Sequence, residues 1–208
     1  QLAPRFQASI LYNGASWKGR KIEPFVGGTD GWAEWKKETQ PQGRTTTGYF
    51  MRKGVDETHN LAERSQSLQP FVILRYGEVL LNKAEACYRN GDETGANDAV
   101  KKIRSRVNLP YSTLSGDELW KAIRQERKVE LAFEGLWYWD LRRWGDAQKA
   151  YPLGLNDYQV HGLKIAPSAL AGQFEYTYVS VDDKDRNYPE RMNRFPMPSD
   201  ELNNNALV

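Results

Sequence analysis

Residues 124–145 read RQERKVELAFEGLWYWDLRRWG, and this stretch decides the fold class. At about 100° per residue, the apolar positions between residues 119 and 133 share one helix face with Glu126, Glu130 and Glu134. Gly135 is a typical helix end, and a second apolar stripe follows it. We therefore expect helices over 115–134 and 137–150 in a mostly α-helical protein.

The three glutamates on this helix face the core in such an arrangement. An ionised carboxylate that leaves water without a partner is costly, so each of them must meet a cation. The nearest candidates in the sequence are Arg127, Arg142 and Arg143, whose guanidinium groups can bind carboxylates through two parallel hydrogen bonds. The pattern predicts a structural network of ion pairs that joins the two helices.

Carboxylates beside tryptophans are also what a glycoside hydrolase needs for its acid and its base or nucleophile. A general acid requires surroundings that raise its pKa, whereas neighbouring arginines keep a carboxyl group ionised. We therefore expect Glu126, Glu130 and Glu134 to be structural and the protein not to be an enzyme. A hydrolase that uses one of these acids stays open as an alternative.

Two further helices are expected over 72–89 and 94–107, because apolar residues recur there at steps of three and four. Asn90-Gly91 provides a short link, which implies an antiparallel pair. Small alanines where the helices would cross make the pair similar to one tetratricopeptide unit, with Cys87 filling its core. One unit cannot bury its own core, so we expect it to cap a helical array whose other members lie outside this chain.

Residues 1–69 differ from the rest of the chain in composition. They contain eight of the 17 glycines and three of the seven tryptophans, and polar runs separate them. We expect loops and short strands there, facing a ligand, and a helical portion over 70–208. Within that portion, FEYTYVSV at 174–181 alternates well enough for one strand.

The 124–145 segment resembles the C-terminal signature of the SusD/RagB family. Three other segments resemble that family in the same order: PRFQASILYNGASWKGR at 4–20, LRYGEVLLNKAEACYRNGD at 74–92 and RFPMPSDELNNNAL at 194–207. Trp137 is a departure, because relatives commonly carry arginine there. The cation that pairs with Glu130 or Glu134 is therefore expected to differ in this chain.

The resemblance implies a mostly α fold in which tetratricopeptide-like helix pairs pack against a loop-rich, irregular portion with a few short strands. This chain would be the C-terminal part. Members of the family bind oligosaccharides at the cell surface of Bacteroidetes, are lipid-anchored to the outer membrane through an upstream segment, and deliver sugar to a SusC-like TonB-dependent transporter. The resemblance thus implies glycan uptake without chemistry on the sugar and without a cofactor.

Sugars offer apolar C–H faces and a rim of hydroxyl groups, so their sites combine aromatic planes with polar side chains. Trp17, Trp32, Trp35 and Tyr49 lie in the glycine-rich segment, where loops could display them. We expect Trp32 and Trp35 first, because polar residues flank them. The alternative is that these tryptophans hold loops onto the helices, since tryptophan is highly buried on average.

Other classes of function have little support in the sequence. Lys and Arg total 29 against 27 Asp and Glu and are mixed throughout, so no basic stripe favours nucleic acid. Asp183, Asp185 and Asn187 alternate as in a calcium loop, but the following glycine and the distal glutamate are missing, so we expect no metal. His59 and His161 have no companions at ligand spacing. A tetratricopeptide-like scaffold that binds protein and no sugar remains a second hypothesis.

Overall fold

The computed structural model describes residues 3–36, 44–60, 66–151, 160–181 and 187–204. The chain divides into two compact units. The first contains residues 1–137 and 162–179, and the second contains residues 138–161 and 180–208.

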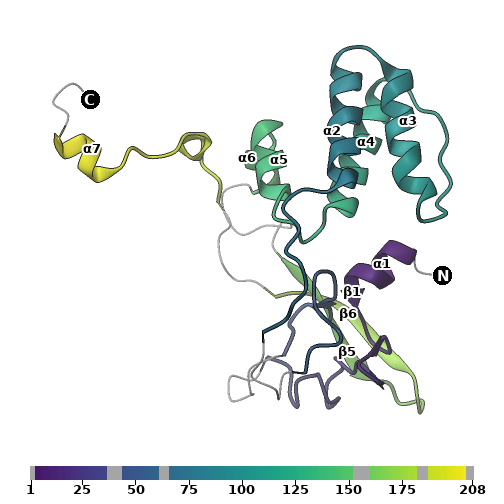
Figure 1. The fold of residues 1–208 in the computed structure, drawn as a ribbon. Coiled ribbons are helices and arrows are strands. Elements are labelled where there is room, and N and C mark those ends of the chain that lie inside the picture. Colours follow the sequence, from purple (N-terminus) through teal and green to yellow (C-terminus); the bar gives the residue numbers. More distant parts are fainter. Residues whose placement is uncertain (1–2, 37–43, 61–65, 152–159, 182–186, 205–208) are drawn as a thin grey trace. The chain divides into compact units, whose positions relative to one another are not determined.

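Three helices of the first unit pack together: α2 over Tyr76–Arg89, α3 over Glu93–Ser105 and α4 over Gly116–Glu130 (Figure 1). The link between α2 and α3 is as short as expected, with Gly91 at φ 77°. Asp92 caps α3 by accepting a hydrogen bond from the backbone N–H of Gly95 at 2.8 Å. Alanine and aliphatic side chains of all three helices pack into one cluster: Ala84, Ala96, Ala99, Val100, Leu119 and Ile123.

Two helix ends differ from the expected bounds. The helix expected from residue 72 begins at Tyr76, and the residues before it are not helical. The helix expected to reach residue 134 ends at Glu130, and a turn with Phe133 at φ 67° follows it. Left-handed backbone cannot continue a right-handed helix, which places Glu134 on the turn. Cys87, which we expected to fill the core, is half-buried against the helical cluster.

Short strands build the rest of the first unit. Helix α1, Pro4–Ser9, runs into β1, Ile10–Leu11, which pairs antiparallel with β4, Phe50–Met51. Strands β2, Ser16–Trp17, and β3, Arg20–Lys21, form a hairpin beside a small apolar cluster of Leu11, Ala15 and Ile22. The strand expected near 174–181 is β6, Phe174–Ser180, and it pairs with β5, His161–Pro167, which the sequence did not predict.

The second unit holds short helices. We expected one helix over 137–150; the structure has α5, Trp137–Arg143, and α6, Ala147–Ala150. Gly145 has φ 72° and interrupts the helix between them. A 3₁₀ turn, Glu190–Asn193, and α7, Ser199–Asn204, follow later in the chain. The fold class is confirmed: mostly α, with a tetratricopeptide-like helix pair, irregular loops and a few short strands.

None of the helices in the described residues combines the length and the apolar character that crossing a membrane would require.

Candidate functional site

The carboxylate of Glu126 is the first member of a buried ion-pair network. Glu126 is 4% exposed and lies on the last turns of α4. Its Oε1 accepts a hydrogen bond from Nη1 of Arg5 on α1 at 2.5 Å, and its Oε2 accepts one from Nη1 of Arg104 on α3 at 3.0 Å. Both oxygens are therefore satisfied by charged donors from two other helices.

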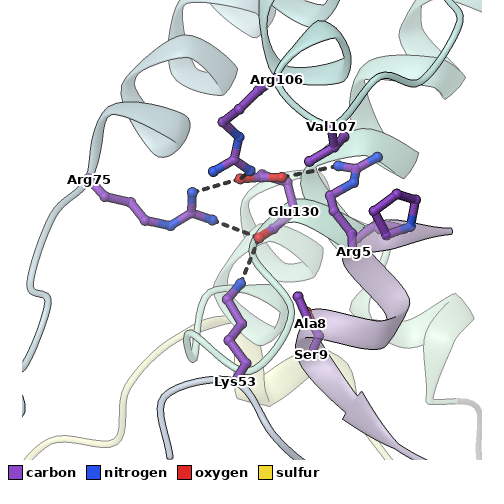
Figure 2. Close-up of a pocket in the computed structure, with 10 residues that line it drawn as sticks. Arg5, Ala8, Ser9, Lys53, Arg75, Arg106, Val107 and Glu130 are labelled. Carbon is purple, nitrogen blue, oxygen red and sulfur yellow. Dashed lines mark hydrogen bonds and ion pairs between the residues drawn. The ribbon is translucent and has the colours of Figure 1, made fainter.

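Glu130, one helical turn further, receives three guanidinium groups (Figure 2). Its Oε1 accepts from Nη1 of Arg75 at 2.7 Å and from Nη2 of Arg106 at 2.6 Å. Its Oε2 accepts from Nη1 of Arg5 at 3.1 Å. Arg5 thus bridges the carboxylates of two successive turns of α4.

Glu134 completes the network from the turn after α4. Its carboxylate accepts hydrogen bonds from Nε and Nη2 of Arg75, with distances of 2.7–3.0 Å. It also pairs with Nζ of Lys53 at 2.5 Å. Lys53 and Arg75 further donate to the backbone carbonyl of Glu130, at 2.8 and 2.6 Å, and so satisfy an acceptor at the C-terminal end of the helix.

The cations of this network are not the ones that the sequence suggested. We expected Arg127, Arg142 and Arg143; the structure uses five others, Arg5, Lys53, Arg75, Arg104 and Arg106. Arg127 donates to Oδ1 of Asn82 on α2 at 2.7 Å. In the second unit, Arg143 pairs with Asp140 on its own helix, and Arg142 lies over the ring of Phe195.

The prediction was wrong because it chose the arginines that lie nearest to the glutamates in the sequence. The partners of the acids lie 22 to 125 residues away, and only the folded topology brings them to α4. Trp137, where relatives commonly carry arginine, has its ring 5.0 Å from Nζ of Lys128. Arg75 and Arg106 supply charge to Glu130 without any contribution from position 137.

The electrostatics keep Glu130 and Glu134 ionised. Burial alone would raise the pKa of Glu130, but the hydrogen bonds and charges of Arg75, Arg106 and Arg5 outweigh it and bring the pKa below its ordinary value. The pKa of Glu134 is lowered in the same way, because Arg75 and Lys53 outweigh its burial. A carboxylate held ionised is a poor general acid, so the arrangement opposes the hydrolase alternative.

A cavity of about 440 Å³ lies beside the network. Its wall contains cationic side chains, one acid and a few apolar groups (Figure 2): Pro4, Arg5, Ala8, Ser9, Lys53, Arg75, Arg106, Val107, Val129 and Glu130. We call it the arginine cavity.

A second cavity, of about 470 Å³, opens near the β2–β3 hairpin. Trp17 and Phe71 contribute aromatic rings to its wall, and Asp56, His59 and Gln69 contribute polar groups. Its remaining wall residues are Lys18, Gly54, Val55, Ser67 and Pro70. We call it the tryptophan cavity.

Hydrogen bonds order the polar side of the tryptophan cavity. Asp56 accepts from the hydroxyl of Ser67 at 2.6 Å and from the hydroxyl of Thr58 at 2.7 Å. These bonds lower the pKa of Asp56 to about 2, so it is an acceptor at neutral pH. Lys18 donates to the carbonyl of His59. Trp17 itself is half-buried and packs against the apolar cluster of the hairpin.

The four aromatic residues that we expected to bind sugar do not line one common cavity of the two described. Only Trp17 lines either of the two cavities described. Trp32 is half-buried and donates from Nε1 to the carbonyl of Thr45 at 2.8 Å, and Trp35 is also half-buried. Tyr49 is 39% exposed, and its ring lies edge to face with the ring of Phe6, with 6.2 Å between the ring centroids.

Sequence reasoning missed several members of the tryptophan cavity. Phe71 is 91% exposed, and we expected it in the helical portion over 70–208 without a role in binding. His59 was considered a loop residue, and Asp56 was not singled out. The available signal for this part of the cavity was the segment GVDETH at 54–59, whose glycine, aspartate and threonine are typical of turns. Nothing in that signal indicated which tryptophan it would meet.

Among the described residues, no group of three His, Cys, Asp or Glu side chains could hold a metal ion. Asp183 and Asp185 of the calcium-like spacing lie outside the described residues.

Comparisons with known proteins agree on one family. The sequence profile of the SusD family matches residues 1–208. The SusD-like protein P38 of Formosa agariphila is 39% identical over 83 residues, which cover 35% of this chain and 16% of that protein. The SusD-like protein P2 of the same organism is 35% identical over 115 residues, which cover 50% of this chain and 21% of that protein.

A crystal structure of a SusD-like protein from Bacteroides fragilis superposes with a TM-score of 0.74 at 29% sequence identity. The match covers 96% of this chain and 36% of that chain. The chain therefore spans about a third of that structure, and about a fifth or less of the two curated relatives.

Proposed function

The chain belongs to the SusD family, and from that membership we propose that it forms part of an oligosaccharide-binding protein. Proteins of this family generally bind glycans and catalyse no reaction. The observation that supports this function in the chain itself is the tryptophan cavity, where an indole ring and an exposed phenyl ring adjoin hydrogen-bonding groups.

The wall of this cavity suits a sugar for physical reasons. Trp17 is anchored by its packing, so its ring can offer a fixed apolar surface to the C–H face of a pyranose. The ionised carboxylate of Asp56 accepts hydrogen bonds from hydroxyl groups, and the amide of Gln69 both donates and accepts them. The volume of about 470 Å³ falls within the range of small-ligand sites, about 300–1,000 Å³.

Trp32, Trp35 and Tyr49 remain candidates for further contacts along a longer glycan. Tyr49 is exposed, and Trp32 and Trp35 are half-buried. We rank Trp17 first, because of the four it is the one that lines either of the two cavities described, and polar side chains line the same cavity.

We further propose that the complete protein acts at the bacterial outer surface, lipid-anchored to the outer membrane. There it would deliver glycan to a SusC-like TonB-dependent transporter without altering the sugar. Family proteins are generally outer-membrane surface lipoproteins that work with such transporters, which supports both statements. The lowered pKa values of Glu130 and Glu134 support the absence of hydrolysis, because neither acid holds a proton to donate.

Isothermal titration of the complete protein against a panel of neutral and acidic oligosaccharides tests the proposal. We expect one class to bind, and Trp17→Ala to weaken it more than the matched variants Trp32→Ala and Trp35→Ala. Near-ultraviolet circular dichroism would verify that each variant is folded. Absence of binding to every glycan would refute the proposal, and release of reducing sugar would restore the hydrolase alternative.

A protein-binding scaffold is the second candidate, and one observation favours it. Large apolar side chains from residue 68 to 76 are strongly exposed, with Phe71 and Ile73 at 91% and 88%. Contiguous exposed apolar surface is typical of protein contacts. Trp17, Trp32 and Trp35 variants that all retained the affinity for the physiological ligand would favour this candidate.

A further inference from the structure

The arginine cavity carries more positive than negative charge. Its wall contains four cations, Arg5, Lys53, Arg75 and Arg106, and one acid, Glu130. The whole network of ion pairs contains five cations against three glutamates, because Arg104 joins it through Glu126. Two positive charges are therefore not neutralised by the acids of this network.

Hydrogen-bonding capacity is also left over in the same place. Arg75 uses Nε, Nη1 and Nη2 in the network. Within the described part of the chain, Arg106 donates only from Nη2 and Arg5 donates only from Nη1. A guanidinium group with unused N–H donors can bind an anion through charge-assisted hydrogen bonds.

Arg5 and Arg106, each of which donates from a single terminal nitrogen in the described part of the chain, converge on one acid. Arg5 reaches Oε2 of Glu130 from α1, whereas Arg106 reaches Oε1 from the C-terminal end of α3 (Figure 2). Glu130 therefore holds both guanidinium groups in place before a ligand arrives. A ligand that binds them then costs less side-chain conformational entropy. Val107 and Val129 provide apolar wall beside them.

We infer that the arginine cavity binds a small oxyanion, a carboxylate or a sulfate group, through the unused donors of Arg5 and Arg106. Guanidinium groups match the geometry of both oxyanions. A carboxylate brings one negative charge and a sulfate brings up to two, which fits the two positive charges left over. The group could come from a free anion or from an acidic sugar such as a uronate.

This inference stands independently of the sugar site, because none of the residues that line the tryptophan cavity also lines the arginine cavity. Anion binding that survives Trp17→Ala would show that the two sites are separate. Failure of one proposal is therefore distinguishable from failure of the other.

The test titrates the complete protein with sodium sulfate, sodium glucuronate and glucose by calorimetry. Ionic strength is held constant with sodium chloride, because salt screens surface charge. We expect saturable binding of sulfate, of glucuronate or of both, and no binding of glucose. Sulfate alone would identify a site for inorganic oxyanions or sulfate esters, and glucuronate alone would identify a carboxylate site.

Arg106→Gln is the diagnostic variant. The side chain of Arg106 is 59% exposed, and Glu130 retains Arg5 and Arg75, so the variant should fold. We expect a loss of affinity of about tenfold, in line with one charge-assisted contact, and partial recovery in Arg106→Lys. Lys121→Gln removes an equal charge from an exposed pair with Glu118 and serves as control.

Two results would overturn the inference. One is that neither anion binds to the unmodified protein. The other is that Arg106→Gln and Lys121→Gln weaken binding equally, which would show a response to net charge and no specific site.

Discussion

Arg5 on α1 donates from Nη1 to Oε1 of Glu126 on α4 at 2.5 Å, although 121 residues separate the two in the chain. The same nitrogen donates to Glu130 one turn later. The N-terminal helix is therefore fastened to the helical core of the first unit through carboxylates that are almost completely buried. The glutamates that look catalytic in the sequence instead connect distant segments.

Glu130→Gln tests this structural role. The amide keeps the shape of the side chain but removes the charge that three guanidinium groups approach. Loss of one partner from a buried ion pair typically costs about 3–5 kcal/mol, and we expect the free energy of unfolding to fall by about that amount. Urea denaturation followed by circular dichroism measures it, and glycan affinity should be unchanged in the folded variant.

Glu118→Gln is the matched control, because Glu118 pairs with Lys121 on the exposed surface of α4. Exposed pairs contribute little, so its denaturation midpoint should stay close to that of the unmodified protein. Equal shifts in the two variants would contradict the assignment of Glu130 to a buried network.

The pH dependence of stability follows from the direction of two pKa shifts. Glu130 and Glu134 have pKa values below the ordinary 4.5 in the folded protein. The unfolded chain therefore binds protons more readily, and the stabilisation is complete above pH 4.5 and is lost as the pH falls toward the lowered values. Melting temperatures measured from pH 7 to pH 3 should show this decline, and Glu134→Gln should make it shallower.

Core packing gives a prediction with a direct internal comparison. Ile123 on α4 has no exposed surface and packs with Ala84, Ala99 and Val100. Its replacement by alanine removes buried methyl and methylene groups and leaves a cavity, so we expect a loss of about 2–5 kcal/mol. Ile73→Ala makes the same chemical change at a residue 88% exposed and should have little effect. Chemical denaturation of the two variants provides the measurement.

Periodicity predicted the parts of the fold that local sequence controls. The helix pair and the third helix appear near the expected residues, because their apolar stripes and the Asn90-Gly91 link act over a few positions. The resemblance to the SusD family is confirmed by the match over the whole chain. The break at Gly145 was missed, since the apolar stripe continues through it and glycine alone does not always end a helix.

Long-range pairing could not be predicted in the same way. Strand β5 was missed because its own composition indicates a strand only weakly. It forms a strand by pairing with β6. The cations of the glutamate network were misassigned for the same reason: Arg5 and Arg75 reach Glu130 across 125 and 55 residues. The sequence indicated that buried acids need cations, and physical principle cannot choose among 29 Lys and Arg without the topology.

Phe71 provides the sharpest test of the tryptophan cavity. Its ring is 91% exposed, so Phe71→Ala should leave the free energy of unfolding almost unchanged. If the ring covers a bound sugar together with Trp17, its loss should weaken glycan affinity about fivefold to tenfold, as expected for one aromatic contact of about 1 kcal/mol. Calorimetric titration with the glycan that binds the unmodified protein measures the effect.

Ile73→Ala, two residues further and also strongly exposed, is the matched control, because Ile73 is not among the residues that line the cavity. Equal affinities in the two variants would place the sugar elsewhere in the protein.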